Sequence, residues 1–198
     1  MFKKYCKGIK EIMPDKKKII VLIGGPGVGK GSIAKMMLDL QPYNYIGVGA
    51  LLRALPPKSE IHKIIENGNL VPDEILFDLL HKQINDGADI ILDGFPRKTS
   101  QAKWLVENYA DKFDIRILNL VVSPDVLINR INKRIASGSA RADDKNQDII
   151  RARLQTFLDE TVPAIEWLRG AKKIIFSDVD VSGNLDNNLS EIMTALEH

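Results

Sequence analysis

The sequence predicts an α/β fold of three layers, in which helices cover both faces of a five-stranded parallel sheet. Two observations lead to this fold class. Short apolar runs alternate with longer helical patterns along the chain, as parallel strands and their crossover helices require. The first apolar run also opens directly into a glycine-rich turn and then a helix start. At 198 residues the chain is long enough for one domain with a substantial core, which we expect over residues 18–198.

Five apolar runs carry the strand prediction. The third and fourth are apolar enough to be buried on both faces, which is typical of strands in the middle of a parallel sheet. Each run is short and bounded by glycine or polar residues. We expect strands near residues 18–24, 43–48, 88–93, 115–122 and 172–177.

The helices follow from apolar spacing and from start and stop signals. Pro72, with two acids after it, is a helix start, Thr99 or Ser100 can cap the next helix, and Gly87 and Gly170 are stop signals. The remaining polar segments, about 50–71 and 137–145, are candidates for mobile flaps. We expect helices near residues 30–40, 59–67, 72–86, 99–110, 124–136, 147–169 and 186–197.

A glycine-rich turn joins the first strand to the first helix and reads Gly24-Gly25-Pro26-Gly27-Val28-Gly29-Lys30-Gly31-Ser32. Such a turn directs several free backbone N–H groups and a lysine ammonium to one point, which suits a phosphate. The strict phosphate-loop pattern has Ser or Thr directly after the lysine, whereas here Gly31 intervenes and the hydroxyl arrives at Ser32. A glycine-rich turn without a ligand is the alternative, but five glycines in nine residues are entropically costly for turning alone.

Acidic and basic side chains follow at positions that suit phosphate chemistry. The third strand ends in Asp93, at the sheet edge where parallel sheets bind ligands, and an acid there can hold Mg²⁺ through water. Arginines at element ends and flap edges predict a clamp for two phosphorylated substrates, because phosphoryl transfer requires spread negative charge to be neutralised and aligned. These arginines are Arg53, Arg97, Arg130, Arg134, Arg141 and Arg153.

Composition excludes several classes. A net charge of +2 does not predict a nucleic-acid partner, and no apolar stretch approaches the roughly 20 residues of a membrane span. Cys6 is the single cysteine, so we expect no internal disulfide, no cysteine zinc cluster and a reducing, cytoplasmic compartment. Residues 1–18 hold seven lysines and two acids. We interpret residues 1–17 as a solvated basic extension rather than a targeting leader, and we expect a monomer.

Together these motifs resemble the adenylate kinase family in its short-lid form, from about Lys18 to the C-terminus. The resemblance implies a P-loop NTPase fold with a short lid at about 137–145 and an acceptor-binding flap at about 50–71. It also implies reversible transfer of the ATP γ-phosphoryl group to a nucleoside monophosphate, with Mg²⁺ as cofactor. The matching segments are the glycine-rich turn, Leu51-Leu52-Arg53, Gly68-Asn69-Leu70-Val71-Pro72-Asp73-Glu74, Asp93-Gly94-Phe95-Pro96-Arg97 with Gln101, Arg130 with Arg134, Arg141-Ala142-Asp143-Asp144 and Arg153-Leu154.

The resemblance also implies residue roles. Asp93 would organise the hydrated Mg²⁺, and Gln101 would hydrogen-bond the acceptor base, as its counterpart does with adenine in members that use AMP. The implied ATP-binding residues are Gly25, Pro26, Gly27, Val28, Gly29, Lys30, Gly31, Ser32, Arg130, which stacks on the base, and Arg134. The implied acceptor-binding residues are Gly49, Arg53, Leu70, Val71, Gly94, Arg97, Gln101, Arg141 and Arg153. The implied catalytic residues are Lys30, Arg97, Arg134, Arg141 and Arg153, with no protein nucleophile.

The chain departs from the family pattern on the acceptor side. Val48 and Ala50 stand where the family has a hydroxyl and a carboxylate, and residues 53–71 form a shorter stretch with Pro56-Pro57. We therefore expect a reduced acceptor flap, with AMP as acceptor on the strength of Gln101. A UMP/CMP or broad-specificity kinase and a binding protein that has lost turnover stay open as alternatives. A GTP switch is disfavoured, since Asn132-Lys133-Arg134-Ile135 lacks the final acid of the guanine-reading pattern.

Overall fold

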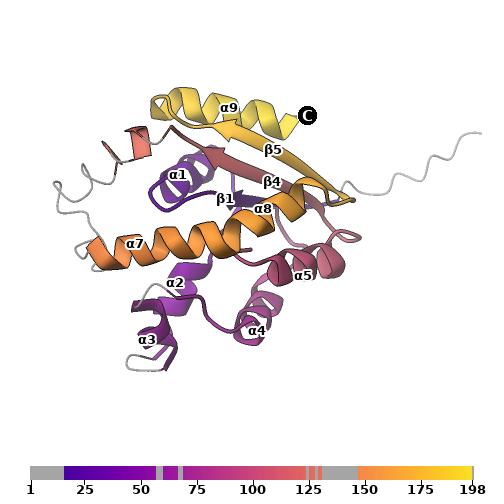
Figure 1. Ribbon diagram of the computed structural model, residues 1–198. Coiled ribbons are helices and arrows are strands. Elements are labelled where there is room, and N and C mark those ends of the chain that lie inside the picture. The colour runs from indigo at the N-terminus through magenta and orange to yellow at the C-terminus, as the bar shows by residue number, and fades with distance from the viewer. Residues whose placement is uncertain are drawn as a thin grey trace, which may run out of the picture.

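Five parallel strands form the sheet in the order β2-β3-β1-β4-β5. The computed structural model describes residues 16–56, 60–66, 69–123, 125–127, 129–130 and 147–197. Helices lie on both faces of the sheet (Figure 1), so the predicted three-layer α/β fold is confirmed. The strands are β1 (Lys18–Ile23), β2 (Asn44–Gly47), β3 (Ile90–Asp93), β4 (Asp114–Val121) and β5 (Ile174–Asp180). The helices are α1 (Lys30–Leu40), α2 (Val48–Arg53), α3 (Glu60–Glu66), α4 (Asp73–Gln83), α5 (Thr99–Tyr109), α7 (Gln147–Thr156), the π-helical segment η2 (Phe157–Thr161), α8 (Val162–Arg169) and α9 (Leu185–Glu197).

The central strand, β1, divides the hydrophobic core into two layers. Its residues alternate, so that Ile19 and Val21 belong to one buried cluster while Ile20 and Leu22 belong to the other. The first cluster packs against α4, α5 and α8, and the second packs against α1 and α9. Strands β3 and β4 flank β1, which confirms their predicted place in the middle of the sheet. All three strands therefore end at one edge, where their loops meet.

An aromatic cluster supports the loop that follows β3. The ring of Phe77 on α4 stacks on Trp104 of α5 at 4.3 Å between centroids, and Phe95 meets Trp104 edge-on at 5.9 Å. Phe95 is buried, and the peptide bond between it and Pro96 is cis. Because Phe95 lies two residues after Asp93, this packing fixes the backbone beside the carboxylate.

Several predicted elements differ in extent. Helix α2 was missed because its six residues are too few to show helical periodicity. The predicted helix 72–86 ends at Gln83, where Ile84 adopts an extended backbone. The cap prediction for Thr99 or Ser100 was wrong, because Lys98 is the N-cap. The predicted strand 172–177 continues to Asp180, paired with β4.

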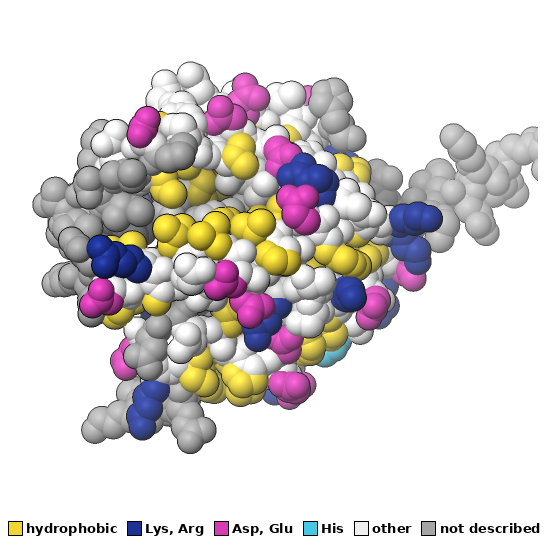
Figure 2. All heavy atoms as spheres, viewed as in Figure 1, with side chains coloured by type: hydrophobic (Ala, Val, Ile, Leu, Met, Phe, Trp, Pro, Cys, Tyr) yellow, Lys and Arg dark blue, Asp and Glu magenta, His cyan; other side chains and the backbone are white. Residues whose placement is uncertain are grey.

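The predicted helix 147–169 runs through α7, η2 and α8 as one helical rod that crosses the front of the molecule in Figure 1. Pro163 sits in the first turn of α8 and has no N–H to donate, and the π-helical residues precede it. Leu154 and Leu158 on this rod are 43% and 51% exposed. Figure 2 shows a band of hydrophobic side chains along the rod. Acidic and basic side chains are interspersed on the same face.

Several predictions lie outside the described residues: the lid at 137–145, most of the basic extension at 1–17, Arg134 and Arg141. Of the predicted helix 124–136, residues 125–127 and 129–130 are described and are helical. In the described part of the chain, no helix has the length and apolar character to cross a membrane.

Candidate active site

A cleft of about 1060 Å³ lies at the C-terminal edge of the sheet, over β1 and β3. Its wall contains most of the predicted site residues that the structure describes, drawn from segments far apart in the sequence. Predicted residues in the wall are Pro26, Gly27, Val28, Gly29, Lys30, Gly31, Ser32, Gly49, Arg53, Leu70, Val71, Asp93, Gly94, Arg97, Gln101, Arg130 and Arg153. Of the predicted set, Gly25 is described but is not in this wall, while Arg134 and Arg141 lie among the residues that the structure does not describe.

The glycine-rich turn adopts a backbone that other residues would strain. Gly24, Gly27 and Gly29 have φ of 143°, 84° and 105°. A Cβ on Gly24 would also lie 2.6 Å from the carbonyl oxygen of Leu120, so β4 leaves room for glycine alone. The N–H groups of Ser32 and Ile33 donate to the Gly29 carbonyl and begin α1. The turn therefore presents backbone N–H groups at a helix start, as a phosphate site requires.

The Lys30 ammonium lies over the turn. Its Nζ donates to the carbonyl oxygens of Gly24 at 2.7 Å and Gly25 at 3.1 Å. These are bonds to neutral acceptors, and a phosphate oxygen is a stronger acceptor for a cation. The lysine is therefore held beside the place where the N–H groups converge.

The Arg130 guanidinium ties this turn to the loop after β5. It donates to the carbonyl oxygens of Val28 at 2.8 Å and Val181 at 2.5 Å. The buried Asn188 amide donates to the same Val181 oxygen at 3.0 Å. Arg130 thus positions two walls of the cleft, a contact that its place in the sequence does not reveal. Its stacking on a base stays a prediction.

Two further arginines line the cleft's other half. Arg53 lies over Gly49, whose added Cβ would be 3.2 Å from Nη1. Arg97 lies over Gly94 in the same way, also at 3.2 Å, and its Nε donates to the Gly94 carbonyl at 3.0 Å. The two glycines face each other, since a Cβ on Gly94 would be 4.0 Å from the Gly49 nitrogen. Each guanidinium group therefore lies over one of two neighbouring backbone segments in the cleft wall, and this positive charge suits an anion.

Gln101 lies in the wall with both ends of its amide bonded. Its Oε1 accepts from the Arg97 N–H at 2.7 Å, and its Nε2 donates to Asp73 Oδ1 at 2.8 Å. The Ser100 hydroxyl donates to the other Asp73 oxygen at 2.5 Å. Sequence reasoning treated Asp73 as a helix-start acid only, because nothing in the local pattern indicates that α5 would supply its donors. Asp73 fixes the orientation of the Gln101 amide.

Asp93 ends β3 as predicted, and the hydroxyl of Tyr45 on β2 donates to its Oδ2 at 3.0 Å. Tyr45 was missed, since only strand pairing brings it beside the carboxylate. Among the described residues there is no cluster of three or more metal-ligating acids, histidines or cysteines. A single carboxylate fits Mg²⁺, which keeps most of its waters and takes other ligands from phosphates.

Two more residues support the cleft from the α7–α8 rod. Phe157 lies under the turn, because a Cβ on Gly25 would be 3.7 Å from its ring. The Thr161 hydroxyl donates to the Arg97 carbonyl at 3.1 Å, which holds the backbone of that arginine. Neither residue carried a sequence signal.

Two aspartates of β5 have lowered pKa values. Hydrogen bonds from the hydroxyl and N–H of Ser182 lower the pKa of Asp180, and the N–H bond measures 2.8 Å. The pKa of Asp178 is also lowered, first by its hydrogen bond from Arg169 and, against the effect of desolvation, by one from Asn119. Both carboxylates therefore remain charged at neutral pH.

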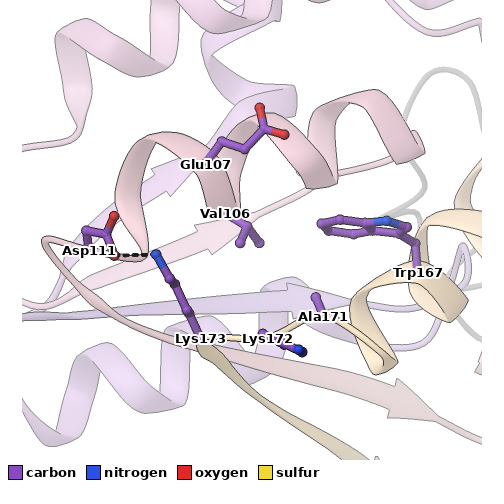
Figure 3. Close-up of a pocket in the computed structure, with 7 residues that line it drawn as sticks. All are labelled: Val106, Glu107, Asp111, Trp167, Ala171, Lys172 and Lys173. Carbon is purple, nitrogen blue, oxygen red and sulfur yellow. Dashed lines mark hydrogen bonds and ion pairs between the residues drawn. The ribbon is translucent and has the colours of Figure 1, made fainter.

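A second hollow, of about 300 Å³, lies between α5 and the residues just before β5 (Figure 3). The side chains of Val106 and Trp167 point into it, and an ion pair of 2.8 Å between Lys173 and Asp111 crosses one end. It contains none of the predicted site residues.

Known proteins resemble this chain over most of its length. The adenylate kinase family model matches residues 22–173. The chain is 34% identical over 188 residues to an adenylate kinase of Bacteroides thetaiotaomicron, covering 90% of this chain and 97% of that protein. It is 37% identical over 159 residues to an adenylate kinase of Rhodopirellula baltica, covering 76% and 81%. It is 30% identical over 197 residues to adenylate kinase isoenzyme 1 of Homo sapiens, covering 92% and 95%. This chain therefore belongs to the adenylate kinase family and is a phosphotransferase, a nucleoside monophosphate kinase.

Proposed function

We propose that the protein transfers the γ-phosphoryl group of ATP to AMP, reversibly, to give two ADP. The observation that carries the proposal is the shared cleft, whose wall contains both the glycine-rich turn with Lys30 and the two arginines Arg53 and Arg97. One half suits the phosphates of a donor and the other suits the phosphate of an acceptor. A site for two phosphorylated substrates is what a nucleotide kinase needs.

In this mechanism the acceptor phosphate oxygen attacks the γ-phosphorus in line, so no protein nucleophile is required. Backbone N–H groups of residues 24–32 and the Lys30 ammonium hold the donor phosphates. Arg53 and Arg97 hold the acceptor phosphate, and Arg153 approaches from α7. The guanidinium groups stabilise the charge that spreads over the transferring group. Arg134 and Arg141, from the family resemblance, are further candidates for that role.

Asp93 would hold a hydrated Mg²⁺ through its carboxylate, with the Ser32 hydroxyl as a second oxygen donor at the exposed start of α1. Bound there with ATP, the ion neutralises the charge of the donor phosphates. Closure of the segments at 50–71 and 137–145 would exclude water, which otherwise competes with the acceptor.

AMP is proposed as the acceptor because Gln101 is buried in the acceptor wall and its amide is fixed by Arg97 and Asp73. A fixed amide can offer its second Nε2 hydrogen and second Oε1 lone pair to a base edge. Val48 and Ala50 are the observation that favours a second candidate, a UMP/CMP or broad-specificity kinase. Val48 is buried and apolar, so it offers no hydroxyl to a base.

An acceptor panel tests the proposal. AMP, CMP, UMP, GMP and their deoxy forms are compared by kcat/KM with ATP in excess. We expect AMP to exceed the others by tenfold or more, about 1.4 kcal/mol of discrimination. A preference for CMP or UMP would select the second candidate. Negligible turnover with every acceptor, together with tight ATP binding in calorimetry, would instead identify a nucleotide-binding protein without transfer.

A further inference from the structure

Tyr45 and Gly47 lie on the same face of β2, because side chains alternate along a strand. Gly47 is the register partner of Asp93 on β3, so the carboxylate belongs to this face too. The Tyr45 ring occupies the place where a side chain at position 47 would stand. A Cβ built on Gly47 would lie 2.9 Å from both Cε1 and the hydroxyl oxygen of Tyr45.

Glycine at position 47 is not required by the backbone. Its φ is −89° and its ψ is 95°, which any residue adopts without strain. The missing side chain instead makes room for the phenol ring to cross the end of the strand. The missing side chain at Gly47 therefore determines where the Tyr45 hydroxyl lies.

That hydroxyl donates to Asp93 Oδ2 at 3.0 Å. Asp93 is the one carboxylate among the described residues that line the cleft, and Ala50, at the start of α2, supplies no other. A donor on one carboxylate oxygen restrains the rotation of the group, while the other oxygen stays able to accept from water. Such contacts behind a metal-holding carboxylate tune its hold on the ion.

We propose that Tyr45 is a positioning residue that orients Asp93 toward hydrated Mg²⁺, and that Gly47 serves by admitting its ring. The inference rests on the proposed function, because it assumes that Mg²⁺ accompanies ATP in this cleft. Tyr45 touches neither reacting atoms nor, in this role, the nucleotide. Its effect is therefore confined to the step that depends on Mg²⁺.

Two variants disturb the contact in different ways. Tyr45→Phe removes the hydroxyl and keeps the ring, whereas Gly47→Ala keeps the hydroxyl and displaces the ring. Tyr43→Phe is the matched control, because Tyr43 directly precedes β2, lies outside the cleft wall, and has a hydroxyl that accepts from Gln41. The double variant of Tyr45 and Gly47 tests whether the two changes act through one contact.

Two quantities are measured for each variant. The first is the free Mg²⁺ concentration that gives half-maximal turnover at saturating ATP and AMP. The second is the dissociation constant of ATP by calorimetry, once with Mg²⁺ and once with EDTA. We expect Tyr45→Phe and Gly47→Ala each to raise the half-saturating Mg²⁺ concentration and the ATP dissociation constant in Mg²⁺ about three- to tenfold. The value in EDTA should not change, and the double variant should match the singles.

The inference would be overturned if Tyr45→Phe and Gly47→Ala had the same half-saturating Mg²⁺ concentration and the same ATP dissociation constant in Mg²⁺ as Tyr43→Phe. A loss of ATP affinity as large in EDTA as in Mg²⁺ would overturn it too, because that result indicates a direct or structural role. Failure of the proposed function looks different, since the unchanged protein would then show no turnover with any acceptor.

Discussion

The two halves of the cleft are built by different means. The donor half is made chiefly of backbone, with three glycines at positive φ after β1 and one lysine at the start of α1. The acceptor half is made chiefly of side chains from α2, α5 and the loop after β3, and the bond of Asp73 with Gln101 holds one of them in place. A backbone site tolerates little change, whereas a side-chain site can be altered residue by residue. The chain follows the family pattern in the first half and departs from it, at Val48 and Ala50, in the second.

The largest effect is expected from the charge of the donor half. Lys30→Met should lower kcat by about 10²- to 10³-fold, because in the proposed mechanism it removes a cation from beside the transferring group. Steady-state kinetics with ATP and AMP measure this loss. Lys35→Met, an exposed lysine on the same helix, is the control and should leave kcat unchanged. Equal kinetics for the two variants would contradict the assignment of the donor half.

A backbone-built half should also fail when a glycine is changed. Gly24→Ala should lower the free energy of unfolding by about 2 to 4 kcal/mol, because its φ is 143° and its Cβ would meet the Leu120 carbonyl at 2.6 Å. Gly31→Ala is the control, since no atom lies within 4 Å of its added Cβ. Denaturant unfolding should show Gly31→Ala to be about 0.5 to 1 kcal/mol more stable, as expected in a helix. Equal stabilities for both variants would argue against the described turn.

The side-chain-built half should respond more mildly and more selectively. Asp73→Ala frees the Gln101 amide to rotate, so the KM for AMP should rise about tenfold while the KM for ATP stays within about twofold. Initial rates at varied AMP and ATP separate the two constants. Asp78→Ala, an exposed residue on the same helix, should change neither. A rise in the KM for ATP alone would contradict the assignment of Asp73 to the acceptor half.

The smallest effect is expected from Asp178, whose bonds with Arg169 and Asn119 join neither half. The folded-state pKa of Asp178 is lowered, so its ionised form stabilises the fold at pH values above the ordinary pKa range of aspartate. That contribution is lost as pH falls through the folded-state pKa. Asp178→Asn should therefore lower the melting temperature by only about 1 to 2 °C at pH 7, since the ion pair of Asp178 with Arg169 is partly exposed to solvent. The difference in melting temperature from the unchanged protein should shrink in acid and vanish once Asp178 is protonated in the folded state. A melting-temperature difference that grows in acid would contradict this pH dependence. Glu191→Gln on α9 is the control.

Much of the fold was predictable because its signals are local. Apolar runs predicted all five strands, and the glycine spacing predicted the turn between β1 and α1. Helix α2 and the three extra residues of β5 were not predictable, since the first is too short to show a period and the second depends on pairing with β4. The π-helical segment before Pro163 was not predictable either, because no repeat in the sequence indicates it.

The same distinction between local signals and long-range contacts applies to the candidate site. The sequence determined which residue types bind phosphate and their order along the chain. The conformational freedom of glycine and the charge of lysine and arginine are properties of the residue type itself. Which groups act together was decided only by the tertiary structure. Strand register sets Tyr45 against Asp93, and the packing of α5 on α4 sets Gln101 against Asp73. Such contacts depend on distances between segments that are remote in sequence, and no local pattern encodes those distances.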